Sequence, residues 1–324
     1  MNVVTIGVGA GLVSALLIAV LAKATPLALL LFLLAPIPVL VVSLGWNHRS
    51  GLVASAVGGI AVALIAGPAD GVAYALGTAL PAWWLAYLAQ LGRPLPDGTI
   101  EWYPLGRLLA WIAATAALTY LAAALVPEAD FAAYEASSRQ AAELLLRMQT
   151  GVRAPAPLPN FGEMPASEVI ARLADAAPVF AAQGFVVVLL FYVWLSGKIV
   201  SVSGRLARPW PYLPATRMPR AVLIVPAAAL IGASLLDGFP GVLAMALLGA
   251  FSMAFALQGL ALIHATTVGR GGRFFVLAGT YLLILMSQGL ILLALVLLGL
   301  LDTAFDLRAR LKPRGKSGPG TPST

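Results

Sequence analysis

The sequence predicts an all-α fold: a polytopic membrane helix bundle with about eight or nine hydrophobic helical segments and one amphipathic helical insertion. First, 60% of the 324 residues are hydrophobic and only 10% are charged, whereas charged residues make up about a quarter of soluble domains. Second, the apolar residues form long runs. The longest, Phe274–Leu301, has 28 residues, and a chain of this length cannot build a soluble core around it. Third, the bases lie mainly in short turns between the runs, as in multi-pass membrane proteins.

Composition also limits the kinds of site and partner. The chain has no cysteine and only two histidines, His48 and His264, so thiolate chemistry is excluded and a histidine-based metal site is disfavoured. The net charge of +7 follows the turns and forms no basic stripe, so we expect no nucleic-acid partner. We also expect no cofactor. The lipid bilayer is the expected partner, with another membrane protein as a further candidate.

The first span, Val3–Ala22, carries small residues at four-residue spacing, namely Gly7, Gly11, Ala15 and Ala19. This spacing places them on one face of a helix, where another backbone can approach closely. They form a candidate helix-docking face. The alternative is that the spacing arises by chance in a chain rich in alanine and glycine.

The second span, Thr25–Leu44, contains Pro36 and Pro38. Each proline removes a backbone donor, so the sequence predicts a break near Ala35. Carbonyls freed inside a bilayer need partners, and such breaks therefore face protein or a cavity. The break either lines a ligand site or is an ordinary kink.

The later spans and the intervening segments divide the chain into four parts. We expect N-terminal membrane helices in 1–126, an amphipathic non-membrane insertion in 127–177, C-terminal membrane helices in 178–307 and a basic disordered tail in 308–324. The expected later spans are Gly51–Gly67, Gly71–Leu91, Leu105–Val126, Val179–Val200, Ala221–Leu236, Pro240–Thr267 and Phe274–Leu301.

The insertion is the one sizeable segment outside the spans. Phe131, Tyr134, Ala141, Leu145 and Met148 recur at helical spacing with charged residues between them, which predicts an amphipathic helix on the membrane surface or on the bundle. Its role is open between a lid, a partner site and a passive connector.

The topology depends on the last apolar run. Nine crossings would place ten Lys and Arg residues on each side of the membrane, so the positive-inside rule could not orient the chain. A turn back at Ser287-Gln288-Gly289 brings the tail to the side of the loops at 201–220 and 268–273, and the counts become fifteen against five. We prefer this second topology, with the basic loops cytoplasmic.

No catalytic motif stands out in the chain. The sequence has no G-x-x-x-x-G-K-[ST], no H-E-x-x-H and no G-x-S-x-G, so we expect a protein that is not an enzyme. A membrane enzyme acting on lipids would have to use Asp237, Asp302, Asp306 or His264.

Neutral polar residues inside the spans are the candidate ligand contacts. Each can instead form an interhelical hydrogen bond, but together they could supply the few polar contacts of an apolar small-molecule pocket. The candidate pocket residues are Gln183, Ser252, Gln258, His264 and Gln288.

The C-terminal half resembles a known family. The proline-rich basic loop ending LPATRMPR, the segment QGLALIH and the closing GLLDTAFDLRAR with Asp302, Asp306 and Arg308 are similar to the YybS-like multi-pass bacterial membrane proteins. APIPVLVV at 35–42 and the small residues of the first span also resemble the substrate-binding S components of energy-coupling-factor transporters. That second resemblance implies that Ala15 and Ala19 belong to a surface that docks on a transmembrane partner.

These observations favour two functions. The first is a small-molecule-binding component of a transporter without its own ATPase, in the bacterial inner membrane. The alternative is a membrane structural or assembly factor that recruits partner proteins through the insertion and the basic loops.

Overall fold

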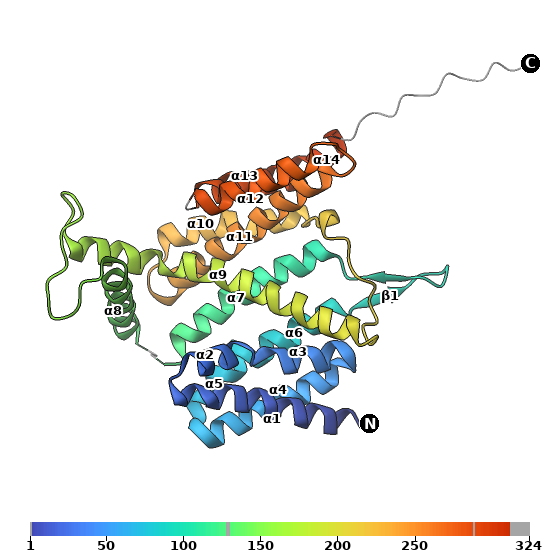
Figure 1. The fold of residues 1–324 in the computed structure, drawn as a ribbon, viewed down its shortest axis with the longest axis horizontal. Coiled ribbons are helices and arrows are strands. Elements are labelled where there is room, and N and C mark those ends of the chain that lie inside the picture. The colour runs from blue at the N-terminus through green and yellow to red at the C-terminus, as the bar shows by residue number, and fades with distance from the viewer. Residues whose placement is uncertain (1, 128–129, 288, 312–324) are drawn as a thin grey trace, which may run out of the picture.

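The chain forms a bundle of membrane-length helices, as predicted (Figure 1). The computed structural model describes residues 2–127, 130–287 and 289–311. Among these residues, seven helical segments are long and apolar enough to cross a membrane, and three more apolar helices are shorter. The seven are Val3–Lys23, Pro26–Gly45, His48–Ala66, Pro68–Ala89, Leu105–Leu125, Ala166–Val202 and Gly238–Thr267. The shorter ones are Arg220–Leu235, Arg273–Met286 and Leu290–Phe305.

The elements of the N-terminal half are short where proline or glycine interrupts them. They are α1 (Val3–Ala19), η1 (Val20–Lys23), α2 (Pro26–Leu33), α3 (Pro36–Gly45), α4 (His48–Ala66), α5 (Pro68–Tyr74), the π-turn η2 (Ala75–Ala79), α6 (Leu80–Ala89), the antiparallel strands β1 (Gly92–Pro94) and β2 (Ile100–Trp102), and α7 (Leu105–Leu125).

The C-terminal half contains the longest helices. Its elements are α8 (Phe131–Thr150), α9 (Ala166–Val202), η3 (Leu213–Ala215), η4 (Arg220–Leu223), α10 (Ile224–Leu235), α11 (Gly238–Thr267), α12 (Arg273–Met286), α13 (Leu290–Phe305) and α14 (Leu307–Leu311). The core lies between α3, α6, α7, α9 and α11, and includes Leu40, Leu85, Ile112, Val186 and Phe255.

The bundle has two chemically different ends. The N-terminus, the β1–β2 hairpin, the loop after α9 and α14 lie at one end, and α8 lies across the opposite end (Figure 1). We call these the basic end and the α8 end. The described bases at the basic end are Arg49, Arg93, Arg107, Lys198, Arg205, Arg208, Arg217, Arg220, Arg270, Arg273, Arg308 and Arg310.

The predicted break of the second span separates α2 from α3, and it faces protein. Ser14 of α1 donates its hydroxyl to the Ala35 carbonyl at 2.5 Å, and Tyr74 of α5 donates to the Ser14 oxygen at 2.7 Å. All three residues are buried. The carbonyls that Pro36 and Pro38 free are those of Phe32 and Leu34, and they accept from the N–H groups of Ala35 and Ile37, both at 3.0 Å. The freed carbonyls are thus satisfied within the chain, as a bilayer requires, and the break is a packed kink.

The predicted boundary at residue 177 lies inside α9, which runs unbroken through Pro178. Proline has no N–H, so it leaves the carbonyl four residues earlier without its helical donor. That carbonyl belongs to Ala174, and the hydroxyl of Ser138 on α8 donates to it at 3.4 Å. The insertion is therefore continuous with the membrane helices: its second part is the first stretch of α9, and α8 docks on it.

The face of α8 that packs on the bundle includes only part of the predicted apolar stripe. Phe131 and Tyr134 pack against Phe239, and Leu145 lines a hollow that α8 shares with α7 and α9. Met148 of the stripe and its neighbour Leu144 are instead 73% and 60% exposed, so these two residues form an apolar strip that faces away from the bundle.

The last apolar run turns back where the sequence predicts a break. The helix α12 ends at Met286 and α13 begins at Leu290, with Gly289 at a φ of 103°. On α13, a Cβ at Gly299 would lie 1.9 Å from the Phe255 carbonyl oxygen of α11. Glycine is therefore required for this close contact, which brings the end of α13 to the basic end.

The predicted helix-docking face is covered by the chain itself. A Cβ at Gly7 would lie 2.6 Å from the Ser50 carbonyl oxygen of α4, and one at Gly11 would lie 2.5 Å from that of Ala54. Ala15 is also buried, and Ala19 is half-buried. The small residues do mediate helix contact, but their partner is α4, so this face is not free to dock another protein.

This packing predicts that Gly11→Leu destabilises the protein, because the backbones of α1 and α4 must move apart. Overpacking of this kind costs about 1–3 kcal/mol. Thermal unfolding of the purified protein in detergent measures the loss. Gly9→Leu is the matched control, since no atom lies within 4 Å of its added Cβ; equal melting temperatures for the two variants would contradict the α1–α4 contact.

Candidate functional site

The structure places the predicted pocket residues at separate points and does not bring them together. Ser252, Gln258 and His264 follow one another on α11 at six-residue intervals, which is about 9 Å per interval along a helix. Gln183 lies on α9 opposite Ser252. Gln288 lies outside the described residues.

Gln183 and Ser252 bond to each other across the α9–α11 contact. The Gln183 amide donates to the Ser252 hydroxyl at 2.9 Å, and this hydroxyl donates to the Gly249 carbonyl at 2.7 Å. A Cβ at Gly249 would lie 2.1 Å from the Val179 carbonyl oxygen. The pair therefore sits where the two backbones approach, in an interhelical hydrogen bond.

Gln258 is the centre of a buried polar cluster. Its Oε1 accepts from the Met218 backbone N–H at 2.8 Å, and its Nε2 donates to Thr303 Oγ1 at 2.7 Å and to Asp302 Oδ2 at 3.1 Å. Gln258, Asp302 and Thr303 are 1%, 4% and 6% exposed. One amide thus joins α11, α13 and the loop before α10.

Arg308 completes this cluster. Its Nε donates to Asp302 Oδ2 at 3.0 Å, and its two terminal nitrogens donate to the carbonyls of Pro214 and Thr216. Burial lowers the pKa of Arg308, an effect that the Asp302 carboxylate opposes. The expectation that the disordered tail begins at residue 308 is therefore wrong, because an arginine at 6% exposure requires fixed partners. Residues 312–324 lie outside the described chain.

Two further arginines hold the loop of residues 203–219, which we call the proline loop. Arg208 donates to the carbonyls of Ala89 and Tyr103 at 3.1 and 2.9 Å. Arg217 pairs with Asp306 at 3.0 Å. The proline loop is thereby tied to α6, to the residues that follow β2 and to the end of α13.

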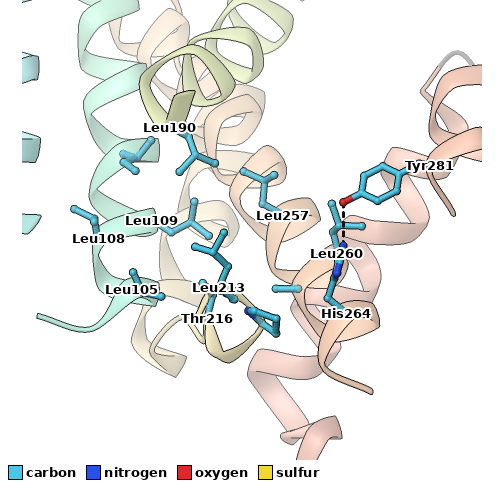
Figure 2. A pocket seen from close by; sticks show the side chains of 13 residues that line it. Leu105, Leu108, Leu109, Leu190, Leu213, Thr216, Leu257, Leu260, His264 and Tyr281 are labelled. Carbon is cyan, nitrogen blue, oxygen red and sulfur yellow. Dashed lines mark hydrogen bonds between the residues drawn. The ribbon is translucent and has the colours of Figure 1, made fainter. Parts of the chain in front are cut away.

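An apolar pocket lies behind the proline loop (Figure 2). It has a volume of about 370 Å³, within the size range of small-ligand sites. Side chains from α7, α9 and α11 form its walls, and Leu213 and Thr216 of the proline loop close one side. The apolar wall residues labelled in Figure 2 are Leu105, Leu108, Leu109, Leu190, Leu213, Leu257 and Leu260.

His264 and Tyr281 provide the polar edge of this pocket. The His264 Nε2 and the Tyr281 hydroxyl lie 2.9 Å apart and share a hydrogen bond (Figure 2). Their rings meet edge to face, with centroids 6.0 Å apart. Tyr281 belongs to α12, which buries none of its described residues, so this bond is a specific tie between α12 and the pocket wall.

This arrangement can bind a small apolar molecule that carries one hydrogen-bonding group. Among the described residues, no group of three or more His, Asp or Glu side chains is placed to hold a metal ion. The two carboxylates nearest the proline loop, Asp302 and Asp306, are engaged by Arg308 and Arg217.

Comparison with known proteins identifies the family. Residues 12–303 match the family model described as "Predicted membrane protein (DUF2232)". The chain belongs to this family. No curated protein and no solved structure matches the chain. The matched range of this DUF2232 member contains the Figure 2 pocket and Gln258, while Arg308 lies beyond it. The resemblances to the YybS-like proteins and to S components remain predictions.

Tyr281, Thr303 and Arg208 were missed by the sequence reasoning. Thr303 follows Asp302 at the end of an apolar run, and two polar residues at that depth were the available signal for a buried cluster. Nothing local marks Tyr281 or Arg208, because their partners lie 17 and more than 100 residues away.

The buried cluster predicts that Arg308→Met is strongly destabilising, since Asp302 then remains buried without its counter-charge. Breaking one partner of a buried pair costs about 3–5 kcal/mol. Thermal unfolding in detergent measures this. Arg310→Met, at the exposed neighbour, is the control. The double variant Asp302→Leu/Arg308→Met should recover part of the loss, and no recovery would contradict this account of the pair.

Proposed function

We propose that this protein is a non-enzymatic component of the bacterial inner membrane that binds a small, mainly apolar molecule and relies on a partner for any energy input. The observation that carries the proposal is the pocket of Figure 2, with its leucine-rich walls and its single polar pair, His264 and Tyr281. Pockets of this kind suit ligands that enter from lipid or carry little charge.

The surroundings of the pocket support binding in preference to catalysis. Its described lining contains no carboxylate, and the one titratable pair is engaged internally. Asp302 and Asp306, two of the three carboxylates that a lipid enzyme could use, hold arginines of the basic end. Because both carboxylates are paired with arginines, neither is free to act as a general acid or base.

We place the basic end on the cytoplasmic side, following the positive-inside rule. The contact of Arg308 with Pro214 and Thr216 supports a shared side for the proline loop and the start of the tail.

This topology predicts the labelling of single cysteines, which the chain otherwise lacks. Ala207→Cys and Arg310→Cys, both at exposed positions, should react with an impermeant maleimide only after the membrane is opened. Ala136→Cys on α8 should react in intact spheroplasts. Opposite labelling of Ala207→Cys and Arg310→Cys would contradict the shared side, and labelling of all three from outside would contradict the orientation.

The pocket predicts that Ala261→Trp reduces ligand binding, because an indole at this wall position fills much of the apolar space. Native mass spectrometry of the protein purified in mild detergent should show a bound small molecule on wild type and at least a tenfold loss on the variant. Ala265→Trp, one helical turn further along α11 and outside the pocket lining, is the control.

The alternative, an assembly factor, is supported by the exposed apolar strip of α8, which contains Leu144 and Met148. The same purification separates the two functions. A partner protein retained equally by wild type and Ala261→Trp, with no small molecule on either, would favour the assembly factor and contradict ligand binding.

A further inference from the structure

A second apolar cavity adjoins the pocket of Figure 2 along a shared wall. It has a volume of about 390 Å³ and is formed by α7, α9 and the proline loop. It shares five lining residues with the pocket of Figure 2, but Phe191, Trp194 and Arg208 line only this second cavity. The shared residues are Leu105, Leu108, Ile112, Leu190 and Leu213. We call it the lateral groove.

The lateral groove opens toward the lipid. Val187, Phe191 and Trp194 lie along its wall on α9 and are 46%, 48% and 43% exposed. The opposite wall contains Leu108 and Ile112 of α7, which are buried. The groove is thus a furrow in the membrane-facing surface with a packed floor.

The length of the groove fits one leaflet of a bilayer. Its lining on α9 extends from Val187 to Gly197, and ten residues of α-helix rise about 15 Å. That is about half of the ~30 Å hydrocarbon core of a bilayer. The end at Gly197 adjoins the proline loop at the basic end, so the groove runs from the membrane surface to about mid-depth.

Two cationic side chains lie at the surface end of the groove. Arg208 lines it directly, and the Lys198 ammonium lies 3.9 Å from the centre of the Trp210 ring, which also lines it. Arg208 donates to two carbonyls, and in the described part of the chain neither Arg208 nor Lys198 forms an ion pair. Burial lowers the pKa of Arg208.

We propose that the lateral groove binds an anionic phospholipid of the leaflet at the basic end. The phosphate headgroup lies beside Arg208 and Lys198, and one acyl chain descends past Phe191 toward Val187. Charge complementarity at the surface end and apolar complementarity over one leaflet favour this occupant. The inference does not rest on the ligand of the Figure 2 pocket, because the residues that test it do not line that pocket.

The test uses the full-length protein, delipidated in detergent and then incubated with defined lipids. Native mass spectrometry should show phosphatidylglycerol retained at least tenfold more than phosphatidylcholine. Inorganic phosphate and glycerol 3-phosphate are added in separate samples, and neither should displace the lipid at equal concentration, since neither fills the apolar groove.

Two kinds of variant separate the head and chain contacts. Arg208→Gln and Lys198→Gln should each lower phosphatidylglycerol retention about tenfold, as expected for one charge-assisted hydrogen bond, and leave phosphatidylcholine unchanged. Gly197→Leu should lower retention of both lipids, because a Cβ there already lies 3.7 Å from Trp210. Gly184→Leu on the same helix is the control, with no atom within 4 Å of its added Cβ.

Lys198 is exposed, so its variant keeps the test valid even if Arg208→Gln loosens the proline loop and lowers the melting temperature. Equal retention of the two lipids by wild type would overturn the proposal. Equal lipid retention by Gly197→Leu and Gly184→Leu would also overturn it. Displacement of the lipid by free phosphate would overturn it too, because it indicates an anion site in which the groove plays no part.

Discussion

The architecture depends on one constraint: every backbone group that a proline frees within the bilayer must find a partner inside the chain. The chain meets it with nearby N–H groups and with hydroxyl groups. At the break between α2 and α3, the N–H groups of Ala35 and Ile37 donate to the freed carbonyls of Phe32 and Leu34, and Ser14 donates to the adjacent Ala35 carbonyl. Where Pro178 interrupts the α9 ladder, Ser138 donates to the freed Ala174 carbonyl. Each hydroxyl bond also fixes a neighbouring helix, since the hydroxyl comes from a different element. Local irregularities therefore become the points at which α1 and α8 are positioned.

Backbone groups at the basic end are also satisfied by side chains from other elements. Gln258 and Arg308 bind backbone groups of the proline loop from α11 and α14, and Arg208 binds the last carbonyl of α6. A helix leaves its last carbonyls without donors and with partial negative charge, so a guanidinium is a suitable partner there. The fixed loop places Leu213 in the lining of both the Figure 2 pocket and the lateral groove. Both cavities thus depend on contacts made outside them.

Much of the fold could be predicted from local patterns. The breaks at Ala35 and after Met286 follow from proline and from a polar Ser-Gln-Gly interruption in an apolar run. The small residues of α1 predict a close helix contact, but no local pattern identifies α4 as the partner. In the same way, Gln258 is recognisable as a polar residue in a span, yet its partners Met218 and Thr303 are 40 and 45 residues away. In the sequence, Arg308 looks like one more base of a polar tail. In the structure, α14 places it beside Asp302.

The composition of the proline loop explains why arginines hold it. Pro209, Pro211, Pro214 and Pro219 remove backbone donors from the segment but keep its carbonyls. A loop of this kind has surplus acceptors, and burying them without donors is costly. A guanidinium carries five N–H donors and no acceptor, which makes it the natural complement. Arg308 serves two loop carbonyls and Asp302 at once, so one side chain satisfies the loop and neutralises the buried carboxylate. Because these contacts are made to backbone atoms, they fix the path of the loop and leave its side chains, above all Leu213, free to shape the cavities.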